Sequence, residues 1–244
     1  MTEVPFSMLA AVATAGLMAA GCGPTPDKAD DPAPAQAGAT TGADAGTAAA
    51  ARLGIDIPDP LGKRGTDTPS AQASPPNEAA IARQIMADPA SYKPENYVYV
   101  TKVLWERGDR QQAAFWHFLF QIRTAPWLPY NPDLGPFRSG VNASIGARIN
   151  EWLGSDYDAW LETTRRAMSY ERRIPLSPER PAGLSQAEWS AAVERARAGW
   201  AADFREITGP TGPTKAALEA QRRSNGRYVG PLQDPGAPLP ADWR

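Results

Sequence analysis

Most aromatic side chains are concentrated in one part of the chain, and this limits where a folded core can form. Of the 21 Phe, Trp and Tyr residues, 18 lie between residues 77 and 208, whereas residues 23–76 contain none. A zone of about 130 residues is long enough to bury one cooperative core. Its 16 basic and 16 acidic side chains balance, as on an ordinary protein surface. We therefore expect one folded domain over residues 77–208.

The periodicity inside this zone is helical. Ser185 and Glu188 have the spacing of a capping box, and Leu184 and Trp189 stand where a hydrophobic staple belongs. Apolar residues then recur at spacings of three and four, as on one face of a helix: Trp189, Val193, Ala196, Trp200, Phe204 and Ile207. Similar patterns predict helices at residues 77–87, 94–107, 110–125, 141–152 and 214–224, and another that Ser155 opens.

For residues 94–107 the sequence has to be examined for a strand as the alternative to a helix. The run YVYV at residues 97–100 favours a strand by residue preference, but that preference is weak evidence. Asp109 and Gln112 have the spacing of a second capping box, which predicts the helix over residues 110–125. A lone strand would leave its backbone groups unpaired, so residues 94–107 are expected to form a helix. The fold class is therefore all-α, an irregular antiparallel helical bundle that contains a helical hairpin.

The run LWERGDRQQAAFWHF at residues 104–118 carries a resemblance. It resembles the hairpin turn of Sel1- and tetratricopeptide-type repeats, with Trp105, Gly108, Ala113 and Trp116 at matching places. Those families stack their hairpins into superhelices that bind peptides and proteins. The pattern LWxxGxxxxAxFW is also similar to a group of uncharacterised bacterial proteins, which implies no known activity.

The first residues have the pattern of a secretion signal. Met8 to Ala20 form 13 residues without a charge, which fits the apolar region of a signal peptide and is short for a membrane span. The run AAGC follows and ends at Cys22, the only cysteine. It resembles the lipobox of bacterial lipoproteins, which implies cleavage before Cys22 and acylation of that residue. The alternative is a short uncleaved anchor in which Cys22 is a chance thiol.

The resemblance places the protein in the bacterial cell envelope. Residues 1–21 are then a signal peptide, and the lipid on Cys22 binds the membrane, with the domain outside the cytoplasm at the periplasmic face of the outer membrane. Residues 22–76 are rich in Ala, Pro and Gly and cannot bury enough apolar surface to offset the entropy of ordering. We expect a disordered tether with a span on the order of 40 Å. Residues 209–244 are expected to form a short helix and a loose tail, with Trp243 either exposed or an anchor.

The single histidine, His117, has two interpretations. It shares a helix face with Arg110 and Gln121, so it could belong to a polar binding strip or act as a general base. The favoured interpretation is a hydrogen-bonded imidazole at the edge of the core, because no nucleophile motif accompanies it. One histidine and one cysteine cannot assemble a nitrogen or thiolate metal site, and we predict no cofactor.

Two charged groups also have alternative interpretations. Asp156, Asp158 and Glu162 could pair as the carboxylates of a glycan-cleaving enzyme, although the first two stand where they would offset a helix dipole. The run RRAMSYERR at residues 165–173 could dock on anionic lipid or form a solvated face paired with Glu162 and Glu171. Lys and Arg are not clustered enough for nucleic acid.

The leading hypothesis is a non-enzymatic module that binds another protein, such as an envelope-assembly or toxin-neutralising protein. Aromatic residues on loops often dominate binding, and the proline-rich loop 126–137 carries three of them. The candidate binding residues are Arg110, His117, Gln121, Arg123, Trp127, Tyr130 and Phe137. The alternatives are the glycan-acting enzyme and a small-ligand groove lined by Trp105 and Trp116. The oligomeric state stays open.

Substitution of Cys22 tests the membrane attachment. The Cys22→Ala protein should carry no lipid, because the acylated sulfur is removed, and it should leave the membrane fraction. Metabolic labelling with a palmitate analogue and fractionation of cells measure both effects. Labelling that persists in Cys22→Ala, or a native protein without label, would contradict the prediction.

Overall fold

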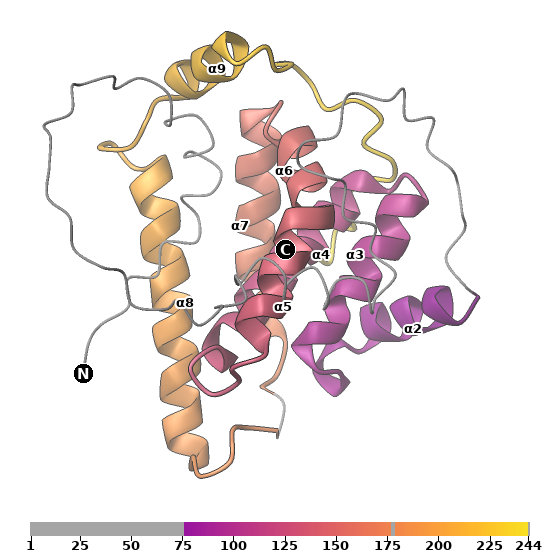
Figure 1. Ribbon diagram of the computed structural model, residues 1–244, viewed down its shortest axis with the longest axis vertical. Helices are drawn as coiled ribbons and strands as arrows, with labels where there is room; N and C mark the ends of the chain where they lie inside the picture. Colours follow the sequence, from indigo (N-terminus) through magenta and orange to yellow (C-terminus); the bar gives the residue numbers. More distant parts are fainter. Residues whose placement is uncertain (1–75, 177–178, 244) are drawn as a thin grey trace, which may run out of the picture.

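The computed structural model describes residues 76–176 and 179–243. The predicted signal peptide, the lipidation site Cys22 and the tether up to residue 75 lie outside the described residues. Within the described part, the chain folds into helices and forms no strand, which confirms the all-α class (Figure 1).

The helices follow one another with short connections. Their bounds are α2 Pro76–Ala87, α3 Tyr97–Glu106, α4 Arg110–Thr124, α5 Leu134–Val141, α6 Ala147–Leu153, α7 Tyr157–Arg173, α8 Gln186–Thr208 and α9 Lys215–Ser224. Two 3-10 turns, Pro89–Ser91 and Pro94–Asn96, precede α3, and one, Ala125–Trp127, follows α4. A π-helical turn, Asn142–Gly146, joins α5 to α6. All the helices that periodicity predicts are present, and α5 is an addition to them.

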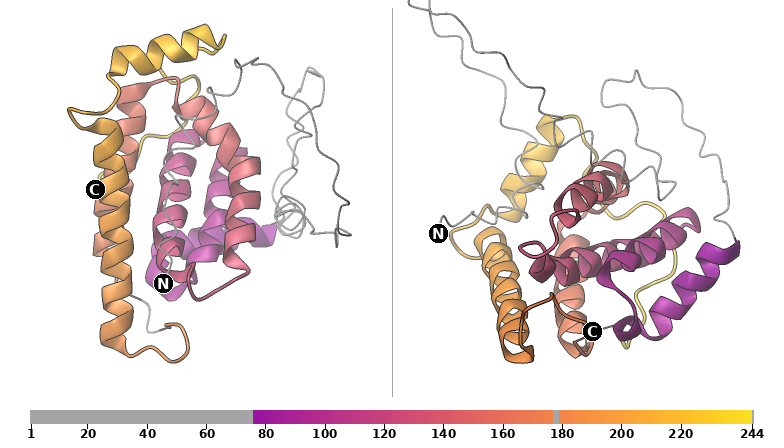
Figure 2. Two further views of the ribbon diagram at one scale, coloured as in Figure 1. Left: turned by 60° about the vertical axis from the view of Figure 1, so that its left-hand side comes forward. Right: turned by 60° about the horizontal axis from the view of Figure 1, so that its bottom comes forward.

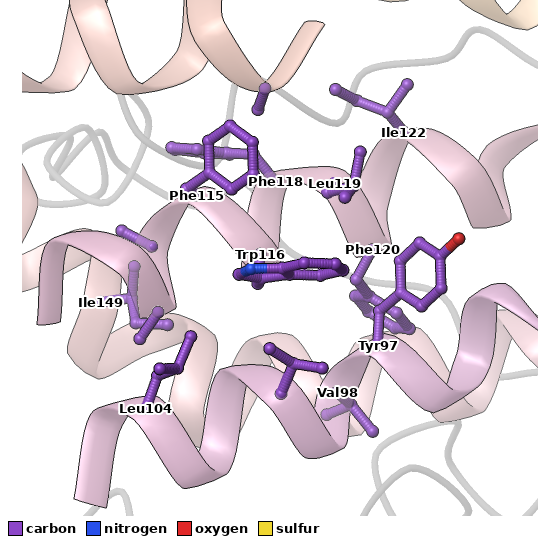
Figure 3. Close-up of a cluster of buried hydrophobic side chains, with 14 of the residues drawn as sticks. Tyr97, Val98, Leu104, Phe115, Trp116, Phe118, Leu119, Phe120, Ile122 and Ile149 are labelled. Atoms are coloured by element: carbon purple, nitrogen blue, oxygen red, sulfur yellow. The ribbon is translucent and has the colours of Figure 1, made fainter. Parts of the chain in front are cut away.

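Helix α4 is the centre of the bundle, and it packs against α3 on one side and α7 on another (Figures 1 and 2). Every residue from Ala113 to Thr124 is buried. Figure 3 shows the indole of Trp116 between side chains of α3, including Val98, and Phe115 of its own helix. The Tyr97 ring meets the Trp116 ring edge to face at a centroid distance of 5.5 Å, a favourable aromatic geometry. This packing of α3 on α4 forms the helical hairpin that the sequence predicts.

The strand-like run YVYV lies inside α3, as the hairpin argument requires. Tyr97, Val98 and Val100 are buried because they face α4 and α2, and packing outweighs residue preference. The Tyr97 hydroxyl donates to the Pro89 carbonyl at 2.7 Å. Burial raises the pKa of Tyr97 to about 12, so this hydroxyl stays a donor at ordinary pH.

The capping predictions are partly right. Ser185 and Glu188 do form a capping box at the start of α8. Helix α7, however, is capped by Asp156, whose carboxylate accepts from the backbone amides of residues 158 and 159. Ser155 is not the cap, because its hydroxyl donates to the Trp152 carbonyl at 2.8 Å instead.

The second predicted capping box, at Asp109 and Gln112, is wrong. The Asp109 side chain makes no cap hydrogen bond to α4, because it pairs with Arg107 at 3.2 Å and accepts from the Ala237 amide. The Gln112 amide donates to the Pro238 carbonyl at 2.9 Å. Both side chains therefore serve a segment that lies far away in the sequence.

That segment, residues 231–243, is here called the strap, and it runs back over the helices (Figure 1). Leu239 and Trp243 are buried in the main core, and the Trp243 ring stacks on Phe115 at a centroid distance of 4.9 Å. The expectation of a loose tail is wrong, because two apolar anchors hold it. Trp243 is an anchor, and the folded domain extends to residue 243 instead of ending at residue 208.

Candidate functional site

The predicted binding residues do not form one surface. Arg123 and Trp127 line a hollow between α4, α7 and α8. His117 and Gln121 lie in a buried polar cluster with residues of α5. Arg110 lies under the strap, where its guanidinium donates to the Gln233 carbonyl at 3.3 Å. The hollow, the polar cluster and the strap contacts are therefore separate places in the fold.

The hollow has a charged floor and apolar walls. Trp127, Leu176, Trp189 and Val193 supply apolar surface, and Arg123, Glu171 and Arg197 lie among them. Its volume is about 20 Å³, room for about one water molecule. Pockets for small molecules measure about 300–1,000 Å³, so this hollow is not a preformed small-molecule site.

The floor is a buried ion-pair triad, defined by Arg123 of α4, Glu171 of α7 and Arg197 of α8. The Arg197 guanidinium donates two hydrogen bonds to the Glu171 carboxylate, from Nε at 2.7 Å and from Nη2 at 2.9 Å. The Nη1 of Arg123 donates to Glu171 Oε1 at 3.3 Å. Arg123 Nη1 also donates to the Ile174 carbonyl at 3.3 Å, and Arg123 Nη2 donates to the Pro175 carbonyl at 3.1 Å. The triad ties three helices together, which makes Arg123 a structural residue.

This triad also corrects the interpretation of the arginine run. Glu171 does not pair with the run on a solvated face, because its side chain is buried against Arg123 and Arg197. Of the run itself, Arg172 pairs with Glu194 at 3.8 Å. Arg166 and Arg173 donate to carbonyls of the strap. Spacing along α7 alone could not identify these partners, since they come from distant segments.

Three aromatic side chains, Trp127, Tyr130 and Trp189, are called the aromatic rim. Trp127 and Trp189 line the hollow, and Tyr130 adjoins them through Trp189. The rings of Trp127 and Trp189 lie 4.7 Å apart, and Tyr130 meets Trp189 edge to face at 6.3 Å. Tyr130 is 41% exposed. Trp127 and Tyr130 were predicted as binding residues, and the structure brings them together with Trp189, which the sequence indicates only as a core residue of α8.

Phe137 does not belong to this rim. It lies in α5 and not in a loop, and its ring packs edge to face on Phe120 of α4 at 6.0 Å. The spacing of Leu134, Phe137 and Val141 is that of an apolar helix face. This signal could have predicted α5 from the sequence.

The buried polar cluster consists of His117 and Gln121 of α4, Arg138 of α5 and Asn142 of the π-turn. The Nε and Nη2 of Arg138 donate to Gln121 Oε1 at 3.2 and 2.6 Å. The Gln121 amide in turn donates to Asn142 Oδ1 at 2.5 Å. Arg138 is completely buried and forms no salt bridge with a described residue. Its Nη1 and the Nδ1 of His117 have no hydrogen-bond partner among the described residues.

Burial controls the protonation of this cluster. Burial lowers the pKa of Arg138 to about 10. Burial, followed by the charge of Arg138, lowers the pKa of His117 to about 4. The imidazole is therefore neutral at physiological pH. It lies inside the core and not at its edge, which corrects that part of the favoured interpretation. Its Nδ1 has no partner among the described residues. Gly146 packs on it, since a Cβ there would lie 2.9 Å from His117 Cε1.

Two carboxylates of the enzyme alternative and both tryptophans of the groove alternative make other contacts. Asp156 caps α7, and Asp158 pairs with Lys215 at 2.6 Å. Trp116 is completely buried, so it cannot line an open groove with Trp105 as one alternative requires. Trp105 instead meets Trp152 edge to face at 6.0 Å.

Among the described residues, no group of three or more His, Cys, Asp and Glu side chains could hold a metal ion. No helix in the described part of the chain is long and apolar enough to cross a membrane. No protein-family model, curated protein or solved structure matches this chain.

Removal of the charge at Glu171 tests the triad. Glu171→Gln keeps the side-chain shape but leaves the buried Arg123 without a counter-charge and Arg197 with only the exposed Glu194, so the free energy of unfolding should fall by about 3–5 kcal/mol. Urea unfolding followed by circular dichroism measures the change. The matched control is Glu194→Gln, since Glu194 is exposed and also pairs with Arg197; it should cost under about 1 kcal/mol. Equal costs would contradict the structural role.

The single histidine gives a pH test. The unfolded chain binds a proton at His117 near its ordinary pKa of 6.5, whereas the folded chain resists protonation down to about 4. Stability should therefore fall by up to about 3 kcal/mol as the pH drops from 6.5 to 4. The difference between wild type and His117→Gln isolates this effect, because the carboxylates are common to both proteins. Parallel stability curves would show that His117 is not buried in its neutral form.

Proposed function

We propose that this protein is a lipid-anchored component of the bacterial cell envelope whose helical domain binds another protein. Support for the anchor comes from the sequence: the lipobox-like AAGC run and the Ala- and Pro-rich residues before the domain. Several acyl chains give durable membrane attachment, because each buried CH₂ contributes about 0.8 kcal/mol. The domain would then face partners within the reach of its tether.

The observation that carries the binding proposal is the exposure of Tyr130. Among the large hydrophobic side chains of the described residues, only Tyr130 and Tyr228 are exposed. The Tyr130 ring meets the ring of Trp189, which lines the hollow together with Trp127, whereas Tyr228 lies after α9. Aromatic side chains gathered around a small depression are typical of binding hot spots.

The surroundings of the aromatic rim favour a protein over a small molecule as the partner. Lys93 and Glu179 pair at 3.8 Å, and both are more than half exposed. This charged pair lines the hollow together with Trp127 and Trp189. An apolar centre with a polar border is the usual anatomy of a protein interface. The hollow is too small for a small-molecule ligand, so the contact surface offered to a partner would be the exposed aromatic ring beside it.

The rim is also held rigidly, which lowers the entropic cost of binding. Trp189, Ala192 and Val193 of α8 form a small apolar cluster with Trp127 and Leu176. The triad of Arg123, Glu171 and Arg197 fixes α8 to α4 and α7 directly below this cluster. A preorganised surface loses little freedom when a partner docks.

Site-specific crosslinking in the native cell tests the proposal. A photoreactive amino acid replaces Tyr130 in the full chain, and the matched control carries it at Tyr228, which is similarly exposed. We expect a covalent adduct with one protein from position 130 and none from position 228. Adducts of equal yield from both positions, or none from position 130, would refute the rim as the binding surface.

A further inference from the structure

The strap is held in the way that a bound peptide is held. It has no helix or strand, and four of its 13 residues are prolines. Its backbone carbonyls accept most of its hydrogen bonds from α4 and α7. Arg166 Nε donates to the Trp243 carbonyl at 2.8 Å, and Arg173 Nη2 donates to that of Asp242 at 2.6 Å. Arg166 also donates to the Pro240 carbonyl.

The α4 side of the same surface holds the earlier part of the strap. The Gln111 backbone amide donates to the Pro235 carbonyl at 3.0 Å, and the Gln112 side chain donates to that of Pro238 at 2.9 Å. These donors bond only to the backbone of the strap and do not depend on which side chains it carries. Most side chains of residues 233–238 are accordingly exposed.

Two side chains of the strap, four residues apart, are buried in the domain. Leu239 and Trp243 are buried, while Ala241 and Asp242 between them are exposed. The Trp243 ring stacks on Phe115 and meets Trp116 edge to face at 5.5 Å. Tyr170 closes the third side at 6.4 Å. This aromatic cage and the donors Gln112, Arg166 and Arg173 are together called the strap groove.

A glycine sets the position of the strap on the helical hairpin. Gly236 has a φ of +73°, and a Cβ there would overlap the Gly108 carbonyl and come within 2.5 Å of Asp109 Cα. The strap backbone therefore lies directly on the turn between α3 and α4. Only glycine allows both this conformation and this approach.

We propose that the strap groove is a recognition site for an extended, proline-containing protein segment of the form L-P-x-x-W, and that the strap is its intramolecular occupant. Donors aimed at backbone carbonyls, together with aromatic surfaces, are the means by which proteins bind extended proline-rich segments. A partner segment with the same two anchors displaces the strap. The strap groove is separate from the aromatic rim, so this proposal and the proposed function can fail independently.

The covalent connection between the strap and α9 determines how tightly a partner segment must bind to displace the strap. The strap is joined to α9 by residues 225–230, so it competes at an effective concentration on the order of millimolar. A free peptide should therefore bind the intact chain weakly. If the connection is cut, the strap becomes an ordinary ligand, and exchange should be easy to observe.

The experiment uses the full chain with a protease site inserted after Gly226, where the turn is exposed and a Cβ would meet no other atom within 4 Å. After cleavage, a fluorescent peptide of residues 231–243 is added and its anisotropy is measured. We expect the nicked protein to bind the peptide one to one and the uncut protein to bind it at least about tenfold more weakly. The helical circular dichroism signal should stay unchanged.

Matched variants show whether the groove is responsible. Arg166→Ala should weaken peptide binding about tenfold, since it removes charge-assisted hydrogen bonds. Arg172→Ala on the same helix should not, because Arg172 pairs with Glu194 and not with the strap. In the peptide, Trp243→Ala should abolish binding, whereas Ala241→Ser, at an exposed position, should leave it intact.

Three results would overturn the proposal. Loss of the helical signal on cleavage would show that the strap is a fixed part of the core. Absence of peptide binding to a folded, nicked chain would show that the groove does not accept a segment in trans. A concentration-dependent dimer of the uncut chain, sensitive to Trp243→Ala, would assign the groove to a second copy of this protein.

Discussion

The burial of α4 on every face is the constraint on which the rest of the structure depends. A helix that is enclosed all round depends on its neighbours for the partners of its polar side chains, since an unpaired buried group is costly. In α4 only two buried side-chain atoms, the Trp116 Nε1 and the His117 Nδ1, have no such partner among the described residues. Arg123 obtains its counter-charge from Glu171 of α7, and Gln121 is bonded by Arg138 of α5. The Thr124 hydroxyl turns back to the Phe120 carbonyl at 2.7 Å. These demands determine where α5, α7 and α8 can lie.

The same enclosure explains where the protein presents its surfaces. Helices alone do not cover α4 completely, and the strap closes the side that carries Phe115 and Trp116. At the other end of α4, the chain leaves the core at Trp127, and the N-terminal part of α8 covers it only in part. The strap groove and the aromatic rim are therefore the two thinly covered ends of one buried helix. Both contain aromatic side chains, exposed at Tyr130 and buried beneath the strap at Phe115 and Trp116.

Local patterns predicted the helices but not the partners of buried charges. The stripe from Trp189 to Ile207 and the capping box at Ser185 report on α8 alone, so they could be recognised in the sequence. Glu171 and Arg138 carry no such signal, because their partners come from other helices and depend on how these pack. Asp109 and Gln112 show the cost of a purely local view: they match a capping motif but bind the strap. The strap was missed because an extended segment with anchors at Leu239 and Trp243 has no regular period.

Amide hydrogen exchange on the full chain tests this account most directly, since it reports the opening free energy of each segment. The amides of residues 113–124 should exchange slowest and only through global unfolding. The strap and its hydrogen bond from Gln111 should open at lower free energy while α4 stays protected. Exchange of the strap together with α4 at the global free energy would contradict the account, and so would exchange of α4 before the surrounding helices.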